Sequence, residues 1–115
     1  VVPNMFGDII NDLGAMLQGG MGAAASANIH PGGAGMFEPI HGSAPKYAGK
    51  NVANPVAAVA SVQLLLDFVG EPEAAEAVET AIAESLRTRK VPSLSANCGL
   101  STSEIGELLA GEVRG

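Results

Sequence analysis

One stretch of sequence decides the fold of this chain, and it runs Met36-Phe37-Glu38-Pro39-Ile40-His41-Gly42-Ser43-Ala44-Pro45. Its first half predicts a short strand, which Pro39 limits because proline cannot donate to a strand ladder. From His41 to Asn54 the sequence follows neither the helical nor the strand period. A long irregular segment in a compact chain is typically functional or disordered, and this one lacks a disordered composition. Residues 41–54 are therefore the first place to look for a site.

The residues before this stretch predict a helix and a hairpin. Apolar side chains recur at the spacing of an amphipathic helix over residues 5–18, and they are Phe6, Ile10, Leu13 and Leu17. Gly19-Gly20 ends that helix. Alanine-rich residues 23–29 predict a short strand, and Pro31-Gly32-Gly33 predicts the turn before the strand at 36–40.

The residues after the stretch predict three helices. The first has Asn54 as N-cap and Pro55 at its first position, and it ends at Gly70. Because that helix is apolar almost all round, we expect it to be buried. The second begins at Pro72, residues 91–100 form a loop, and a capping box predicts the start of the last helix at Ser101-Thr102-Ser103-Glu104.

Composition excludes several classes of protein. The chain has 115 residues and a net charge of −6 with only six Lys and Arg, which argues against a nucleic-acid partner. Its length allows one small domain or a piece of one, and the opening Val1-Val2-Pro3-Asn4 suggests a processed or truncated product. Cys98 is the single cysteine, and neither a membrane-spanning run nor a signal peptide is evident. We therefore expect a cytoplasmic protein with no membrane partner.

Two acids on the first predicted helix form a candidate metal site. Asp8 and Asp12 are four residues apart, so their carboxylates lie on one helix face. A hard divalent cation would offset their repulsion and accept oxygen ligands. The alternative is that acids early in a helix complement its dipole and face water. Two acids alone do not complete a Mg²⁺ or Mn²⁺ site.

The irregular segment 41–54 has the chemistry of a nucleotide-binding loop. Its small residues let the backbone approach a flat or anionic ligand closely. The side chains suited to stacking, hydrogen bonding and charge are His41, Ser43, Asn54, Lys46 and Lys50. The alternative, which these residues leave open, is an ordinary loop that ends in an asparagine N-cap.

Three other features carry little functional weight. Residues 20–25 match a loose G-x-G-x-x-A dinucleotide fingerprint, but they follow a predicted helix instead of a strand and precede no helical pattern. His30 is typical of a plain loop histidine, beside Pro31 and Gly32. Cys98 has no nearby histidine to activate it as a nucleophile.

The motifs together resemble the C-terminal third of the isocitrate and isopropylmalate dehydrogenase family, the metal-dependent β-decarboxylating dehydrogenases. The resemblance extends from residue 4 to about residue 112, and its segments occur in the family's order. Those segments are Asn4-Met5-Phe6-Gly7-Asp8-Ile9-Ile10-Asn11-Asp12, Gly19-Gly20-Met21-Gly22, Ser26-Ala27-Asn28, residues 36–45, Ala48-Gly49-Lys50 and Asn54-Pro55.

This resemblance implies an α/β fold of two domains, of which the chain is the helix-rich C-terminal fragment. Residues 1–30 would belong to the central metal and dimer domain, and residues 31–115 to the C-terminal part of the cofactor-binding domain. The family acts as a homodimer that oxidises a 2-hydroxy acid, passes the hydride to a nicotinamide cofactor and releases CO₂. The short predicted strands cannot complete a sheet, so a stable isolated fold is not expected.

The resemblance also assigns site residues. Asp8 and Asp12 match metal ligands for Mg²⁺ or Mn²⁺. The positions that match the cofactor loop are His41, Gly42, Ser43, Ala44, Pro45, Lys46, Tyr47 and Asn54. The family's arginine cluster, catalytic Tyr and Lys, and third metal Asp have no counterpart in these residues. We therefore expect no catalytic residue within the chain, and an inactive fragment when it is alone.

The residues support more than one cofactor and more than one substrate. Lys46-Tyr47 resembles the NADP-using isocitrate enzymes, whereas Ser43 and residues 102–107 resemble isopropylmalate dehydrogenases, which use NAD. The resemblance favours NAD and the conversion of 3-isopropylmalate to 2-oxoisocaproate in leucine biosynthesis. Isocitrate, homoisocitrate and tartrate dehydrogenases are alternatives, and a non-catalytic nucleotide-binding or interaction module is an alternative of another class.

Overall fold

The computed structural model describes residues 2–17 and 19–115 of the chain. Its elements in order are α1 (Asn4–Leu17), β1 (Ala25–Ile29), β2 (Gly35–Pro39), the 3₁₀ turn η1 (Pro45–Tyr47), α2 (Val56–Phe68), α3 (Pro72–Arg87) and α4 (Thr102–Arg114). The predicted helices and strands are therefore confirmed, with small shifts at their ends. None of the described helices has the length and apolar content of a membrane span.

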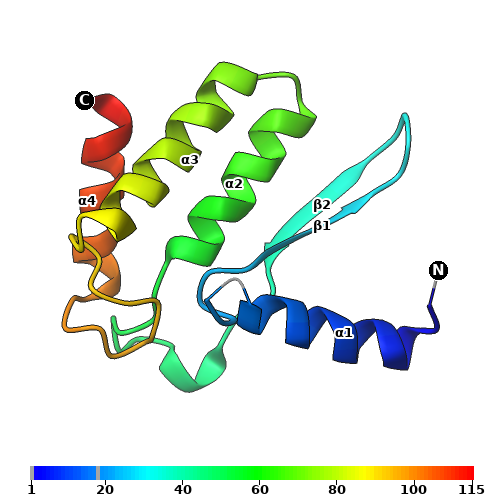
Figure 1. Cartoon of the computed structure of the whole chain (residues 1–115), viewed down its shortest axis with the longest axis horizontal. Helices are drawn as coiled ribbons and strands as arrows, with labels where there is room; N and C mark the ends of the chain where they lie inside the picture. Colours follow the sequence, from blue (N-terminus) through cyan, green and yellow to red (C-terminus); the bar gives the residue numbers. More distant parts are fainter. Residues whose placement is uncertain (1, 18) are drawn as a thin grey trace.

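The elements after α1 form a row that begins at the hairpin. Figure 1 shows β1 and β2 beside α2, α3 on the other side of α2, and α4 packed against α3. The loop of residues 91–100 returns below this row and leads into α4 (Figure 1). Because of this return, three segments that are distant in sequence meet below α2.

The two strands pair antiparallel as a hairpin. Ala25 faces Pro39 and Ile29 faces Gly35, and the turn between them contains the predicted Pro31-Gly32-Gly33. The hairpin contacts α2 through Phe37 and Phe68, whose ring centroids are 5.4 Å apart. This two-stranded sheet ends at Pro39, so residues 41–47 leave it directly below α2.

Two expectations for α2 are wrong. The helix begins at Val56 with Pro55 as N-cap, although the Asn54 side chain still accepts a hydrogen bond from the Val56 amide at 3.0 Å. The helix is also not buried all round, since Leu65 keeps 40% of its surface exposed. The physical reason is that the hairpin and α3 cover only part of its circumference.

The core lies between α2, α3 and α4. Its fully buried side chains are Val56, Val91, Ile105 and Leu109. The predicted capping box at the start of α4 is confirmed, because Ser101 Oγ accepts from the Glu104 amide while the Glu104 carboxylate accepts from the Ser101 amide. This box caps α4 at the point where loop 91–100 ends.

Helix α1 is confirmed as a helix, but its apolar stripe is not covered. Phe6 is 53% exposed and Leu17 is 91% exposed, and Ala15 is the buried residue of the helix. Figure 1 shows α1 running away from the rest of the molecule below the hairpin. Gln18, the last residue of the predicted helix, lies outside the described residues. The helix therefore contributes little to the core of the described chain.

Candidate functional site

A cavity of about 430 Å³ lies where the three segments below α2 meet. Its walls come from the turn after α1, from residues 41–54 and from the loop before α4. The lining residues are Gly19, Gly20, Met21, Gly22, His41, Ala44, Tyr47, Ala53, Asn54, Leu94, Ser95 and Ala96. This size suits a small-molecule site, and the lining is mostly small or apolar with a few polar groups.

Glycine makes the first wall possible. Gly19 and Gly20 adopt positive φ angles of 111° and 97°, which side chains other than glycine rarely accept. Gly22 packs so closely on Leu94 that an added Cβ would overlap the Leu94 carbonyl oxygen. The Gly22 carbonyl in turn accepts from the Ala57 amide at 3.1 Å. This turn therefore joins the first turn of α2 to the loop before α4.

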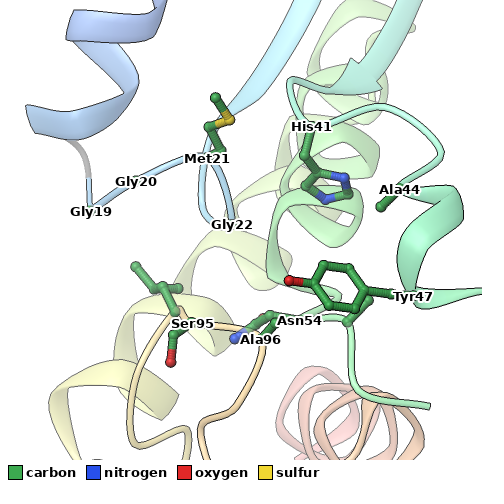
Figure 2. Close-up of a pocket in the computed structure, with 12 residues that line it drawn as sticks. Gly19, Gly20, Met21, Gly22, His41, Ala44, Tyr47, Asn54, Ser95 and Ala96 are labelled. Carbon is green, nitrogen blue, oxygen red and sulfur yellow. The ribbon is translucent and has the colours of Figure 1, made fainter. Parts of the chain in front are cut away.

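The second wall carries the aromatic groups. Figure 2 shows the His41 and Tyr47 rings reaching one space from a single segment, with Ala44 between them in sequence. His41 Nδ1 lies 2.8 Å from the Gly42 carbonyl oxygen, which fixes its ring. Ala44 adopts φ 43° at the start of η1, and this tight bend brings Tyr47 back toward His41. The two rings offer a flat ligand a face on which to stack.

Asn54 lies at the end of the second wall, and its side chain makes hydrogen bonds to other parts of the protein. Its Nδ2 donates to the Ser93 carbonyl at 3.0 Å, and its Oδ1 accepts from the Val56 amide. The residue is only 6% exposed. Its side chain therefore joins loop 91–100 to the start of α2 at the edge of the cavity.

The structure brings together only part of the predicted cofactor loop. His41, Ala44, Tyr47 and Asn54 line the cavity. The other four predicted residues do not line it, and they are Gly42, Ser43, Pro45 and Lys46. Lys46 is exposed, with its Nζ 5.2 Å from the centre of the Tyr47 ring.

Sequence reasoning missed two walls of this cavity. In the sequence, residues 19–22 end a helix and match a family segment but are assigned no part of the site, and residues 94–96 are only part of a loop. The glycine fingerprint remains rejected, because this turn follows a helix and leads into a strand. The physical signal in residues 19–22 is the density of glycine, which predicts close backbone approach without identifying the partner.

A second cavity lies between α1 and the hairpin. It is lined by both predicted metal ligands, Asp8 and Asp12, and by Glu38 of β2. The dipole alternative is wrong about position, since α1 begins at Asn4 and has no acid in its first turn, but Asp8 and Asp12 are both exposed to water as it expects. Among the described residues no cation lies within ion-pair distance of either aspartate. Both carboxylates therefore line one cavity, and no cation among the described residues pairs with either of them.

The donor set fits part of a metal site. Carboxylate oxygens are the ligands that Mg²⁺ and Mn²⁺ prefer. Within residues 2–17 and 19–115, no three His, Cys, Asp or Glu side chains lie close enough together to hold an ion. Asp8 and Asp12 can therefore supply two oxygen ligands, and further ligands must come from other groups.

Clear pKa shifts occur on α3 and α4, at residues that line neither cavity. Hydrogen bonds from Arg87 lower the pKa of the Glu84 carboxyl, and the Ser101 hydroxyl and amide lower the pKa of the Glu104 carboxyl. Both carboxyl groups are exposed, and their hydrogen bonds are made within or at the start of the helices that carry them. Lys90 and Glu112 form a further ion pair between the end of α3 and α4.

Comparison with known proteins decides the family. A family model described as isocitrate/isopropylmalate dehydrogenase matches residues 1–109. The chain belongs to the isocitrate/isopropylmalate dehydrogenase family. A 3-isopropylmalate dehydrogenase of Frankia casuarinae is 50% identical over 100% of this chain and 33% of its own length. One of Clavibacter michiganensis subsp. michiganensis is 50% identical over 93% of this chain and 30% of its own length.

Solved structures agree with this assignment. An isocitrate dehydrogenase from Methylococcus capsulatus is 39% identical, with a TM-score of 0.87 over 97% of this chain and 33% of its own. A beta-decarboxylating dehydrogenase from Thermococcus kodakarensis is 33% identical, with a TM-score of 0.77 over 96% of this chain and 32% of its own. The expected α/β fold class is confirmed, and this dehydrogenase-family chain spans about a third of the length of the curated relatives it matches.

Proposed function

We propose that this chain supplies the dinucleotide cavity and half of the metal site of a β-decarboxylating dehydrogenase. The observation that carries the proposal is the cavity in which His41, Ala44, Tyr47 and Asn54 meet the glycine turn and the loop before α4. A second cavity holds both aspartates. The family's dehydrogenase names support the same reading.

In this proposal the cavity binds the adenosine end of the cofactor. The imidazole of His41 stacks on the adenine ring, and Tyr47 closes the opposite part of the space. Residues 19–22 and Ala44 leave room for the ligand because they carry little or no side chain. The Asn54 side chain holds the surrounding loops in place at the edge of this space.

Asp8 and Asp12 are the two metal ligands that this chain contributes. A bound Mg²⁺ or Mn²⁺ would supply Lewis acidity toward the substrate's hydroxyl oxygen and later carbonyl oxygen. The two aspartates hold and orient the ion from one face of α1, because residues four apart on a helix share a face. Glu38 also lines that cavity, but it does not form a three-ligand cluster with the two aspartates.

The preferred cofactor is NAD, with NADP as the alternative that Lys46 and Tyr47 suggest. Lys46 is exposed beside Tyr47 and could hold a 2′-phosphate. In the complete polypeptide, Lys46→Asp should weaken NADP selectively, because its carboxylate would repel that phosphate. Equal changes in the Kd of NAD and NADP would contradict this role for Lys46.

The proposed substrate is 3-isopropylmalate, converted to 2-oxoisocaproate in leucine biosynthesis. The curated relatives support it, since they are 3-isopropylmalate dehydrogenases. The alternatives are isocitrate, homoisocitrate and tartrate, and a solved isocitrate dehydrogenase of similar structure favours the first. We further propose a cytoplasmic homodimer, which is consistent with the uncovered apolar stripe of α1.

The proposal is tested with the complete polypeptide that contains this chain. It should reduce NAD when 3-isopropylmalate and Mn²⁺ are both present, and reduce it more slowly with isocitrate. This chain alone should be inactive, since the arginine cluster and the catalytic Tyr and Lys expected for the family have no counterpart in it. NAD binding by the complete polypeptide without turnover of any of the four acids would instead favour the non-catalytic nucleotide-binding module.

A further inference from the structure

Four hydrogen bonds join the segment before Asn54 to the first turn of α4. The Thr102 amide donates to the Asn51 carbonyl at 3.0 Å, and the Thr102 hydroxyl donates to the Ala53 carbonyl at 2.6 Å. The Ser103 amide and hydroxyl both donate to Asn51 Oδ1, each at 3.1 Å. We call this set of bonds the α4 tie.

The α4 tie satisfies groups that a helix cannot satisfy by itself. The first amides of a helix have no partner within it. Asn51 accepts from two of them, and Ser101 Oγ accepts from a third, the Glu104 amide. Asn51, which lies 52 positions before Ser103, therefore helps to cap α4.

The residue type at position 51 meets two requirements at once. Asn51 has a φ of 55°, in the left-handed region that asparagine tolerates better than most residues. Its side chain must also present an oxygen toward Ser103. Glycine would satisfy only the first requirement, and aspartate would satisfy both.

The other end of the tied segment lies in the nucleotide cavity. Ala53 and Asn54 line the cavity, as do Ser95 and Ala96 of the loop that leads into α4. Asn54 also reaches that loop through its bond to the Ser93 carbonyl. Two facing walls of the cavity are therefore held to one another at Asn54 and again at the start of α4.

We propose that Asn51 is a positioning residue for the nucleotide site. It does not line the cavity, and it acts by fixing Ala53 and Asn54 against the loop before α4 through the α4 tie. This inference rests on the proposed nucleotide-binding function. It assigns a role in nucleotide binding to Asn51 and to α4, neither of which lines the cavity.

The test compares two substitutions at this position in the complete polypeptide. Asn51→Gly keeps the left-handed backbone but removes the oxygen, and it should raise the Kd of NAD about fivefold. Asn51→Asp keeps the oxygen and places its charge at a helix N-terminus, where negative charge is favoured. It should therefore restore the Kd to within about twofold of the wild type.

Two controls distinguish a positioning role of Asn51 from a general loss of stability. Ser101→Ala removes a cap of α4 but leaves all bonds of the α4 tie, so it should leave the Kd of NAD unchanged. The Kd of Mn²⁺, measured in the same variants, should not change either, because Asp8 and Asp12 lie in the other cavity.

Each contrary result has a distinct meaning. If the wild type binds NAD and Asn51→Gly binds it equally well, the inference is wrong and the proposed function stands. If Ser101→Ala weakens NAD as much as Asn51→Gly does, the effect is one of stability and the inference is also wrong. If the wild-type polypeptide does not bind NAD, the proposed function fails and the inference fails with it.

Discussion

At the scale of single residues, Gly22 is a position where the structure leaves no room for a side chain. Its backbone packs against the Leu94 carbonyl, and Leu94 is part of the loop that lines the proposed nucleotide cavity. A carbonyl oxygen cannot move aside as the end of a flexible side chain can. The position therefore requires glycine for a reason of space, since its φ is not in the left-handed region.

We expect Gly22→Ala to destabilise the protein by about 1–3 kcal/mol, as other overpacking substitutions do. It should also weaken nucleotide binding, because the Leu94 loop must move away. Urea unfolding and a nucleotide titration would measure the two effects. Gly106→Ala is the matched control, since an added Cβ there meets no atom within 4 Å and alanine favours helix. Equal effects at the two positions would contradict the close approach.

The aspartates of α1 give the second prediction at this scale. Asp8→Asn in the complete polypeptide should weaken Mn²⁺ binding at least about tenfold, because it replaces a charged oxygen ligand with a neutral one. NAD affinity should change little, since Asp8 lies in the other cavity. The control is Asp67→Asn, which removes a charge from the exposed face of α2. An unaltered Mn²⁺ titration would refute the ligand assignment.

At the scale of elements, the capping box of α4 predicts a dependence on pH. The Ser101 hydroxyl and amide donate to the ionised Glu104 carboxylate, and they hold its pKa below the ordinary value of 4.5. A carboxyl with a lowered folded pKa contributes stability above its unfolded pKa, and that stability is lost as the pH falls through the folded value.

We therefore expect Ser101→Ala to destabilise the protein at pH 7 by about 1 kcal/mol through the lost cap. The difference from the wild type should shrink as the pH falls below 4.5, because Glu104 is then becoming protonated in both proteins. Urea unfolding at several pH values measures it, with Glu107→Gln as a control on the same helix outside the box. A difference that is constant with pH would contradict the linkage.

The elements also show how far the sequence can be interpreted alone. Local signals were sufficient for the helices, the hairpin and the capping box, because each depends on residues a few positions apart. Burial was predicted less well. An apolar stripe indicates that a face needs a partner but not which partner, and Leu65 and Leu17 remain exposed.

The candidate site likewise has a part that the sequence predicts and a part that it does not. His41, Ala44, Tyr47 and Asn54 are in or beside one irregular segment that the sequence singled out. Leu94, Ser95 and Ala96 come to the cavity through a long-range approach that Gly22 permits. No periodicity predicts such a contact, because its two sides are separated by more than 70 positions.

At the scale of the whole molecule, α1 is the feature that needs a partner. Its large apolar side chains are exposed, and they are Met5, Phe6, Ile9, Ile10, Leu13, Met16 and Leu17. A soluble monomer rarely exposes a continuous apolar surface of this kind. The proposed homodimer would cover it.

We expect Leu13→Asp to shift the complete polypeptide from dimer toward monomer, because a charge would have to be buried at the interface. Sedimentation velocity measures the change. Ala74→Asp adds the same charge to the exposed surface of α3 and should leave the dimer intact. A dimer that is unaffected by Leu13→Asp would show that this face of α1 is not the interface.

The capping of α4 by a distant asparagine has a consequence for synthesis of the protein. Asn51 leaves the ribosome's catalytic centre 52 residues before Ser103. At about 5–20 residues per second, Ser103 follows it roughly 3–10 s later. During that interval the proposed nucleotide loop has been synthesised, but the helix that anchors it has not. In the proposed function, the nascent chain should therefore bind the cofactor more weakly until α4 has emerged.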